Sequence, residues 1–262
     1  MDRATDRPPS SSELAGRFYD ALAPDYDAMT GFDRRFDQER PFFQQFVERY
    51  AIRRAVDAGA GTGFHSLLLA QLGVQVIAVD VSSDMLEVAR AHSETMNLPV
   101  TTLHASLLDF AAHITVRQDA VVCMGNTLAH FTEPGGRDTV LAQFFGVLAP
   151  RGVLLVQTLN FDKIMKLETH LQNVKEAGGV RFVREYMPAE DLVDLRITRS
   201  APSDPAARQM STSVRLAPVF AADLALALSN AGFSEVQLHG SIALDMFSAD
   251  NSRDLVAVCR RT

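Results

Sequence analysis

The chain has 262 residues, of which 47% are hydrophobic and 22% charged, a composition typical of a globular protein with one large α/β domain or two small ones. Its net charge of −7 and its lack of a basic stretch argue against nucleic acid and anionic membranes as partners. The chain has two cysteines without metal-type spacing, which predicts a reduced compartment and no bound metal. The N-terminus is polar and no apolar run reaches 18 residues, so we expect a cytoplasmic protein without a membrane span.

The N-terminal part is expected to be helical after a short tail. Residues 1–13 are polar and rich in serine and proline, which predicts a disordered tail ahead of a single domain at 14–262. Apolar residues then recur at helical spacing, which predicts an amphipathic helix over 39–50. Residues 14–50 together form an N-terminal helical segment that is expected to cover the site.

From residue 54 onward, short apolar runs alternate with amphipathic stretches. The expected strands are residues 54–57, 74–80, 100–104, 120–124, 152–158, 236–238 and 255–259. The expected helices cover residues 62–72, a stretch capped by Ser82 or Ser83, residues 140–148 and residues 221–231. Strands that alternate with helices imply right-handed crossovers and parallel pairing. The sequence therefore predicts an α/β fold with a Rossmann-like, doubly wound, seven-stranded and mostly parallel sheet.

The alternation stops between residues 160 and 218. Three strands without intervening helices are expected there, at residues 181–187, 192–199 and 210–219. They predict a small antiparallel β insert that caps the substrate. Because side chains alternate along a strand, Arg184 and Tyr186 share one face of the first insert strand and Arg181 lies on the other. Which face meets the site and which is solvated stays open.

The most informative stretch follows the first expected strand. Asp57, Gly59, Gly61 and Gly63 form the pattern D-x-G-x-G-x-G, and Asp80 ends the second expected strand. Glycines let the backbone approach a ligand closely, and an acid about 20 residues later can accept hydrogen bonds from ribose hydroxyls. The spacing differs from the G-x-G-x-x-G of a dinucleotide site, and a leading carboxylate suits a cation better than a diphosphate. A turn that uses its glycines for geometry alone leaves the two acids unexplained.

This segment resembles motif I of the class I S-adenosylmethionine-dependent methyltransferases. The resemblance implies that S-adenosyl-L-methionine is the methyl donor, that S-adenosyl-L-homocysteine is the product, and that no metal is required. It implies that the first acid faces the donor's amino group, that the turn meets its carboxylate, and that apolar residues after the second strand flank adenine. The donor-binding residues expected in this half are Asp57, Gly59, Ala60, Gly61, Gly63, Asp80, Val81 and Met85.

The same resemblance assigns donor contacts outside the glycine turn. Ser106 stands where the family usually has an aspartate that binds the adenine amine, and the Leu107 amide could reach adenine N1. Met124 and Gly125 follow the fourth strand and are expected to line the donor site. Tyr26 belongs to the segment that in related enzymes folds over the donor, where it could orient the donor during catalysis; the alternative is that it anchors a surface helix.

Residues 125–130 carry a second resemblance. They read G-N-T-L-A-H and are similar to the G-N-S-x-x-H segment of glycine and glycine/sarcosine N-methyltransferases, and the residues around Pro150 and Asn160 extend the likeness. These relatives place an arginine directly before that asparagine, suited to a substrate carboxylate, whereas this chain has Leu159. Arg181 or Arg184 could take over that role.

The resemblance implies methyl transfer to a small-molecule acceptor, with nitrogen slightly preferred to oxygen. His130 is the candidate base, because a neutral imidazole can accept a proton; the alternative is that it packs against the donor and shapes the pocket. The acceptor contacts expected are Tyr19, Asn126, His130, Asn160, Arg184 and Tyr186. Transfer from a sulfonium is an in-line displacement, so the protein's main tasks are alignment and exclusion of water.

Other functions stay open on the sequence. A nicotinamide-dependent oxidoreductase would share the strand-turn-helix-acid layout, and a catalytically silent S-adenosylmethionine-binding protein would keep the same donor residues. A macromolecular methyltransferase is disfavoured by the acidic charge and by Gly125-Asn126-Thr127 in place of Asn/Asp-Pro-Pro-Tyr. The oligomeric state is not predicted, and a homodimer is compatible with the sequence.

Overall fold

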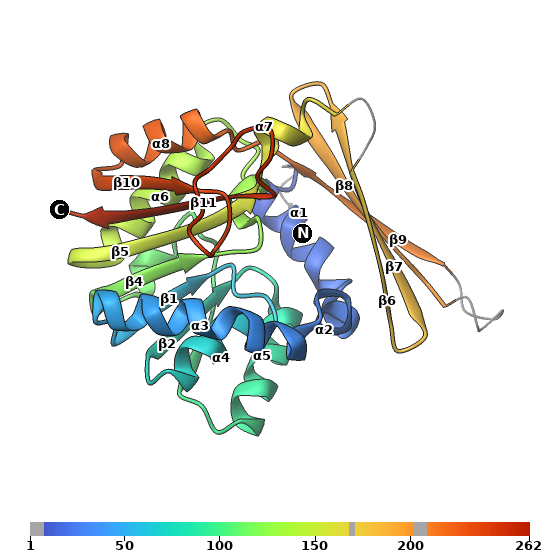
Figure 1. Ribbon diagram of the computed structural model, residues 1–262. Coiled ribbons are helices and arrows are strands. Elements are labelled where there is room, and N and C mark those ends of the chain that lie inside the picture. Colours follow the sequence, from blue (N-terminus) through green and yellow to red (C-terminus); the bar gives the residue numbers. More distant parts are fainter. Residues whose placement is uncertain (1–7, 168–170, 202–208) are drawn as a thin grey trace, which may run out of the picture.

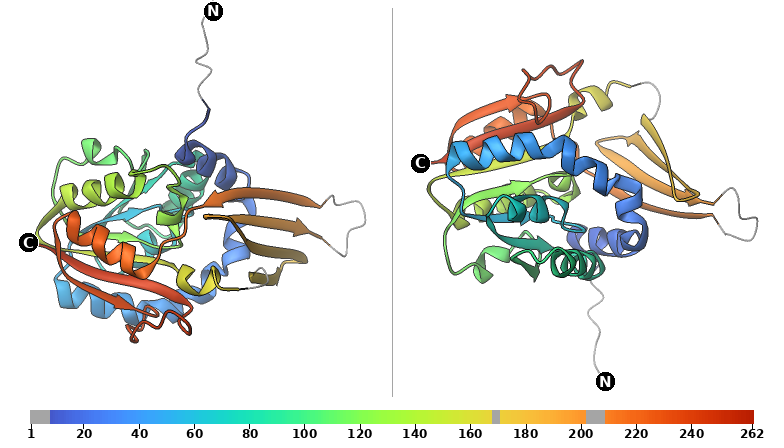
Figure 2. Two further views of the ribbon diagram at one scale, coloured as in Figure 1. Left: turned by 90° about the horizontal axis from the view of Figure 1, so that it is seen from above. Right: turned by 60° about the horizontal axis from the view of Figure 1, so that its bottom comes forward.

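A computed structural model describes residues 8–167, 171–201 and 209–262, and the statements below concern this part of the chain. Its main body is a seven-stranded sheet covered by helices on both faces. A second sheet of four strands stands beside the main body, and the first two helices lie between the two (Figure 1). Figure 2 shows the smaller sheet reaching away from the carboxyl ends of the central strands.

The main sheet has the strand order β10-β11-β5-β4-β1-β2-β3. Its strands are β1 (Arg54–Ala58), β2 (Gln75–Asp80), β3 (Val100–His104), β4 (Gln118–Cys123), β5 (Leu148–Leu159), β10 (Phe233–His239) and β11 (Asp254–Arg261). The first five pair in parallel, whereas β11 pairs antiparallel with both β5 and β10. This confirms the predicted doubly wound sheet. The chain runs outward from β1 in one direction and returns through β4 in the other, so the switch in strand order lies between β1 and β4.

Two apolar cores cover the two faces of this sheet. Alternate residues of β1 belong to different cores, because side chains of a strand point to opposite faces. Ala55 packs in the core that contains Phe43 and Phe64, and Val56 packs in the core that contains Phe144. The covering helices are α3 (Phe32–Tyr50), α4 (Phe64–Gln71), α5 (Ser83–Thr95), α6 (Gly136–Val147) and α8 (Ala221–Asn230). None of the described helices is long and apolar enough to cross a bilayer.

Helix α3 begins seven residues before its predicted start at residue 39. The added turns are mostly polar, so their sequence shows no clear apolar stripe. Tertiary contacts stabilise these additional turns, because the rings of Phe32 and Phe36 both pack against Phe64, at centroid distances of 5.4 and 4.7 Å. The predicted stretch 39–50 was therefore the C-terminal part of a longer helix.

The N-terminal segment consists of α1 (Ser11–Asp20), the 3₁₀ turn η1 (Ala23–Asp25) and α2 (Tyr26–Thr30). Helix α1 starts inside the tail that the sequence assigned to residues 1–13, of which residues 1–7 lie outside the described part. A capping box explains the early start: the Ser10 hydroxyl accepts from the Glu13 amide while the Glu13 carboxylate accepts from the Ser10 amide. We call residues 11–30 the lid.

The second sheet contains β6 (Leu171–Ala177), β7 (Val180–Ala189), β8 (Leu192–Ser200) and β9 (Met210–Leu216), all antiparallel and in that order. The predicted insert lacked β6, which is polar and largely exposed and has no alternating apolar pattern. Pairing with β7 through a turn at Gly178 and Gly179 makes it a strand. Residues 168–170 and 202–208 of the predicted insert lie outside the described residues. Connecting elements η2 (Phe110–His113), η3 (Thr127–His130) and α7 (Phe161–Ile164) complete the fold.

Candidate functional site

A pocket lies at the carboxyl ends of β1, β2 and β4, beneath the lid. Many of the predicted site residues meet there: Tyr19, Tyr26, Gly59, Gly61, Asp80, Val81, Leu107, Met124, Gly125 and His130. Sequence reasoning missed four further lining residues, which are Ser12, Ala15, Thr127 and Phe131. The capping box at Ser10 could have revealed that the first two belong to a helix. The pocket occupies the switch in strand order, where open α/β sheets bind their ligands.

The glycine turn is shaped by hydrogen bonds from its own backbone. The amides of Gly59 and Ala60 both donate to the Val79 carbonyl, at 2.8 and 3.0 Å, and the Gly61 amide donates to Asp80 Oδ2 at 2.8 Å. A Cβ on Gly59 would lie only 2.5 Å from Thr127, so this position has no room for a side chain. The turn thus joins the end of β1 to the acid at the end of β2.

Gly61 and Gly63 serve different purposes although both have positive φ. A Cβ on Gly63 would approach Ala89 Cβ at 2.9 Å, so this glycine allows the turn to pack against α5. A Cβ on Gly61 would meet only the Tyr26 ring, at 3.8 Å. Gly61 therefore faces the open pocket, where a ligand could approach its backbone.

Asp57 is a buried carboxylate with an incomplete set of partners. Its Oδ2 accepts from the Ser66 hydroxyl at 2.7 Å, but Oδ1 is buried without a hydrogen-bond partner. Burial raises the pKa of Asp57, and the nearby His65 and the Ser66 bond act in the opposite direction. Asp57 does not itself line the pocket, but it directly precedes the glycine turn that does. A buried acceptor without a donor is costly, so Oδ1 is suited to an N–H donor.

Asp80 is buried as well and binds two backbone amides, those of Gly61 and Ser82, the latter at 2.9 Å. Burial raises its pKa, while these backbone bonds lower it. Each carboxylate oxygen can accept a second hydrogen bond. The side chain lines the pocket and can therefore still receive the hydroxyl groups of a ribose.

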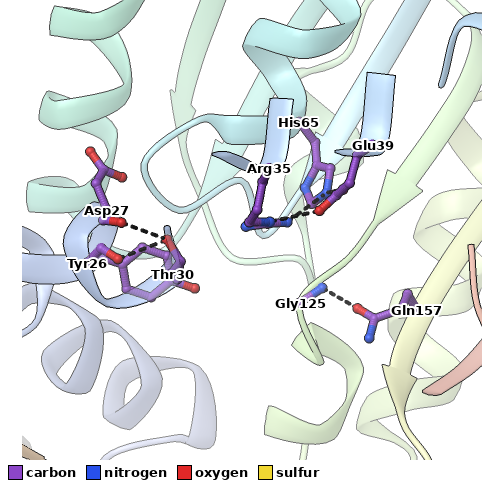
Figure 3. A network of polar contacts seen from close by, with 8 residues as sticks. All are labelled: Tyr26, Asp27, Thr30, Arg35, Glu39, His65, Gly125 and Gln157. Atoms are coloured by element: carbon purple, nitrogen blue, oxygen red, sulfur yellow. Dashed lines mark hydrogen bonds and ion pairs between the residues drawn. The ribbon is translucent and has the colours of Figure 1, made fainter. Parts of the chain in front are cut away.

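A charged cluster joins helices α3 and α4 (Figure 3). Arg35 Nε lies 2.7 Å from Glu39 Oε1, His65 Nε2 lies 3.1 Å from Glu39 Oε2, and the Arg35 guanidinium lies 4.0 Å above the Phe64 ring. Burial alone would raise the pKa of Glu39, but the bonds from His65 and Arg35 lower it to about 2. Sequence reasoning gave this cluster no role, because His65 is 26 residues from Glu39 and meets the Arg35–Glu39 pair only in the fold.

The pocket also holds a tyrosine-histidine pair. Tyr19 Oη lies 2.9 Å from His130 Nε2, and the Tyr26 ring packs edge-on against Tyr19. Burial lowers the pKa of His130 to about 4 and raises that of Tyr19 well above its usual value. Both side chains are therefore uncharged near neutral pH. His130 Nδ1 is also buried without a partner, which leaves one polar atom of this pair available to a ligand.

Strand β7 brings its inner face against the lid. Tyr186 and Phe182 are buried, and Arg184 Nη2 donates to the Met29 carbonyl of α2 at 3.3 Å. Burial raises the pKa of Tyr186, and the adjacent Arg184 opposes this shift. Arg181 is exposed, whereas Phe182 and Tyr186 are buried. Arg184 and Tyr186 do not line the pocket, but they lie within electrostatic range of Tyr19.

The remaining predicted site residues have partners elsewhere in the chain. Asn126 Oδ1 accepts from the Leu159 amide at 3.1 Å. The Asn160 side chain donates to the carbonyls of Ser248, Ala249 and Ser252 and caps α7. Met85 is fully buried in the apolar core, and Ser106 Oγ bonds to Ser12 Oγ. These contacts give each residue a structural role that the sequence did not reveal. No group of three His, Cys, Asp or Glu side chains among the described residues is placed to hold a metal.

Comparison with known proteins agrees with this geometry. Residues 55–152 match the family model described as "Methyltransferase domain". The glycine/sarcosine N-methyltransferase of Aphanothece halophytica is 30% identical over 155 residues, which are 59% of this chain and 58% of that protein. The ubiquinone biosynthesis O-methyltransferase of Proteus mirabilis is 31% identical over 122 residues, 47% of this chain and 48% of that protein. The chain thus spans about half the length of these curated relatives.

Solved structures show the same architecture over nearly the whole chain. An S-adenosylmethionine-dependent methyltransferase from Clostridium acetobutylicum superposes with a TM-score of 0.79 at 14% identity, over 93% of this chain and 98% of that one. The amino pentose methyltransferase CalS10 from Micromonospora echinaspora, solved with S-adenosylmethionine, gives 0.65 at 19% identity, over 99% and 100%. Residues 55–152 thus match a methyltransferase domain, and the chain has the Rossmann-like fold of solved S-adenosylmethionine-dependent methyltransferases.

Proposed function

We propose that this protein transfers a methyl group from S-adenosyl-L-methionine to a small-molecule acceptor, with nitrogen preferred to oxygen. One observation carries the proposal: buried Asp57, whose Oδ1 has no partner, directly precedes a glycine turn whose Gly61 faces a pocket that Asp80 also lines. That arrangement matches a ligand with an ammonium at one end and a ribose in the middle. A diphosphate would meet a carboxylate instead of a cation there.

Different residues of the chain would bind different parts of the donor. Asp57 would bind the ammonium, and Asp80 would bind the ribose hydroxyls. Val81 would pack against a face of the base, and Leu107 would contact its edge. Arg35, held over Phe64 by Glu39, would face the donor's carboxylate. S-adenosylmethionine supplies a methyl group on a positively charged sulfur, and the protein aligns that group and excludes water from it.

The acceptor would lie between the donor and the Tyr19–His130 pair. Neutral His130 and Tyr19 can accept and donate hydrogen bonds to an amine without repelling it by charge. The preference for nitrogen is supported by the likeness to glycine/sarcosine N-methyltransferases and to a sugar N-methyltransferase. Arg184, on the inner face of β7, is the cation that could bind an acidic group of the acceptor.

Calorimetry with S-adenosylhomocysteine and with NAD tests the donor. Tight binding of the first and none of the second supports the proposal, and the reverse result would establish a nicotinamide-dependent enzyme. Methyl transfer from labelled donor to a panel of amines, amino acids, amino sugars and phenols then tests the acceptor. If the protein binds the donor but methylates none of these acceptors, the result supports the alternative of a catalytically silent binding protein.

A matched pair of variants tests the role of Arg184. Arg184→Met should raise KM for a carboxylated amine by about tenfold, since a charge-assisted bond is lost, and this effect should exceed any change in donor affinity caused by the lost lid contact. Arg181→Met changes the same residue type on the exposed face of the same strand and should leave KM unchanged. Equal effects of the two substitutions would exclude an acceptor contact by Arg184.

A further inference from the structure

The order of the central strands fixes which part of the donor meets which part of the pocket. Asp57 ends β1 and Asp80 ends β2, and β3 is the next strand outward. A donor with its ammonium at Asp57 and its ribose at Asp80 must therefore extend its base over the ends of β2 and β3. The pocket at that end is lined by apolar side chains and one hydroxyl: Ala15, Val81, Leu107 and Ser12.

Ser12 belongs to the first turn of lid helix α1 and is buried, with 8% of its surface exposed. Its Oγ lies 2.9 Å from Ser106 Oγ, and the Leu108 amide donates to Ser106 Oγ at 3.3 Å. Ser106 thus stands behind Ser12, in the loop after β3, and does not itself line the pocket. Since a hydroxyl has two lone pairs, the bond to Ser106 leaves Ser12 Oγ able to accept a further hydrogen bond.

From this arrangement we propose that Ser12 accepts a hydrogen bond from the exocyclic amine of adenine, and that Ser106 positions Ser12. This inference rests on the proposed donor. It moves the adenine contact that the sequence assigned to Ser106 onto a residue of the lid. Base recognition is then built from two chain segments, 94 residues apart, that meet only when the lid is docked.

The other contacts of α1 show how docking and base recognition are coupled. The Glu133 carboxylate accepts from the amide and the hydroxyl of Ser11, at the start of the helix. The Asp20 carboxylate accepts from the Ser82 hydroxyl at 2.6 Å, at the end of the helix. Both ends of α1 are thus fixed to loops of the main body, which holds Ser12 over the base. Binding of adenine should in turn slow hydrogen exchange in α1.

Paired ligands and paired variants test the proposal. Calorimetry would measure the affinity of S-adenosylhomocysteine and of its 6-deamino analogue, in which purine replaces adenine and N1 is kept. The wild-type protein should prefer the amine-bearing ligand by about fivefold, the size of one neutral hydrogen bond. In Ser12→Ala this preference should fall to about one. Ser12→Thr keeps the hydroxyl and should keep the preference.

Ser11→Ala is the matched control. It removes a lid hydroxyl in the same helical turn that bonds to Glu133 and does not line the pocket. It should lower the affinity for both ligands alike and keep their ratio. The proposal is overturned if Ser12→Ala keeps the fivefold preference, if Ser106→Ala loses it while Ser12→Ala does not, or if Ser11→Ala abolishes it. Failure of the wild-type protein to bind S-adenosylhomocysteine would overturn the proposed function itself, and this inference with it.

Discussion

Asp57 illustrates how one residue can be costly in the free protein and useful in the complex. Its carboxylate is buried and one oxygen has no donor, so burial raises its pKa. An ammonium group of a ligand would supply the missing donor and favour the ionised form. The binding of such a ligand should then depend on the ionisation of this residue.

Donor affinity should therefore increase with pH. Below its raised pKa Asp57 is protonated and offers no negative charge, so the affinity for S-adenosylhomocysteine should fall as the pH is lowered toward 4. Asp57→Asn should bind roughly 10- to 100-fold more weakly at neutral pH, the loss of a charged hydrogen bond, and should show a smaller pH dependence. Calorimetry between pH 4.5 and 8 measures both. Identical pH profiles for the two proteins would exclude contact with the ammonium.

The lowered pKa of His130 predicts how the stability of the protein depends on pH. Its pKa is lowered by burial from 6.5 to about 4, so the unfolded chain takes up the proton before the native protein does. As the pH falls from about 6.5 toward 4, this residue should lower the free energy of unfolding by up to about 1.4 kcal/mol per pH unit. Urea unfolding of wild type and His130→Gln over this range gives the difference. Parallel curves would show that His130 is protonated or exposed in the native state.

The same residue predicts the shape of the activity profile. With a pKa of about 4, His130 stays neutral above pH 5 and contributes no inflection to kcat near pH 6.5. His130→Ala should lower kcat more than donor affinity if the imidazole contacts the acceptor. A larger effect on donor affinity would support the alternative in which it only packs against the donor.

At the scale of elements, the glycine turn depends on three positions with distinct demands. Gly59 has no space for a side chain and Gly63 packs against α5, whereas Gly61 faces the pocket. The lid covers this turn, because the Thr62 hydroxyl donates to Asp27 at 2.6 Å and His92 lies 3.2 Å from the other Asp27 oxygen. Helix α2 is thus tied to both the turn and α5.

Gly61→Ala and Gly73→Ala separate backbone strain from loss of binding. Both glycines have positive φ, and a Cβ on Gly73 would meet nothing within 4 Å. Each substitution should lower the free energy of unfolding by about 1–2 kcal/mol, the cost of a left-handed conformation for alanine. Only Gly61→Ala should also lower the affinity for S-adenosylhomocysteine, which calorimetry measures. Unchanged donor affinity in this variant would mean that the turn does not approach the ligand.

At the scale of the whole molecule, the lid is held between two sheets. Loops of the main body bind it through Ser106, Glu133 and Ser82, and the smaller sheet binds it through Arg184 to the Met29 carbonyl. A salt bridge of 2.5 Å between Arg199 and Asp25 adds a second contact on that side. A ligand beneath the lid should therefore stabilise all three parts together.

Ligand-linked stability measures this coupling. S-adenosylhomocysteine at about 100 times its Kd should raise the free energy of unfolding by about 2.7 kcal/mol, because it binds only the folded protein. Hydrogen exchange should slow in both α1 and β7. Adenosine and methionine, which each occupy part of the pocket, are the controls. Protection confined to the main sheet would show that the lid and the smaller sheet do not close on the donor.

The sequence alone predicted the elements that have a periodic pattern of apolar residues. It did not predict the elements whose structure depends on tertiary contacts. Periodic apolar residues gave all seven strands of the main sheet and four of its helices, since burial on a fixed face leaves a regular pattern. Strand β6 and residues 32–38 of α3 were missed, because these polar sequences become ordered only through contacts with neighbouring elements. Asn126 and Asn160 were assigned acceptor contacts through the resemblance, and the structure adds bonds from both side chains to the backbone that the sequence did not reveal.

By itself, the sequence determined the fold class and the placement of Asp57 and Asp80 at the carboxyl ends of neighbouring strands, because the glycine turn and the two carboxylates lie at fixed spacings within one β-α-β unit. The tertiary structure decided how the pocket is completed. Ser12 and Ser106, Tyr19 and His130, and Arg35 and His65 are pairs that span long stretches of chain. Spacing along the chain carries no record of such contacts, since they arise only when the lid and both sheets pack together.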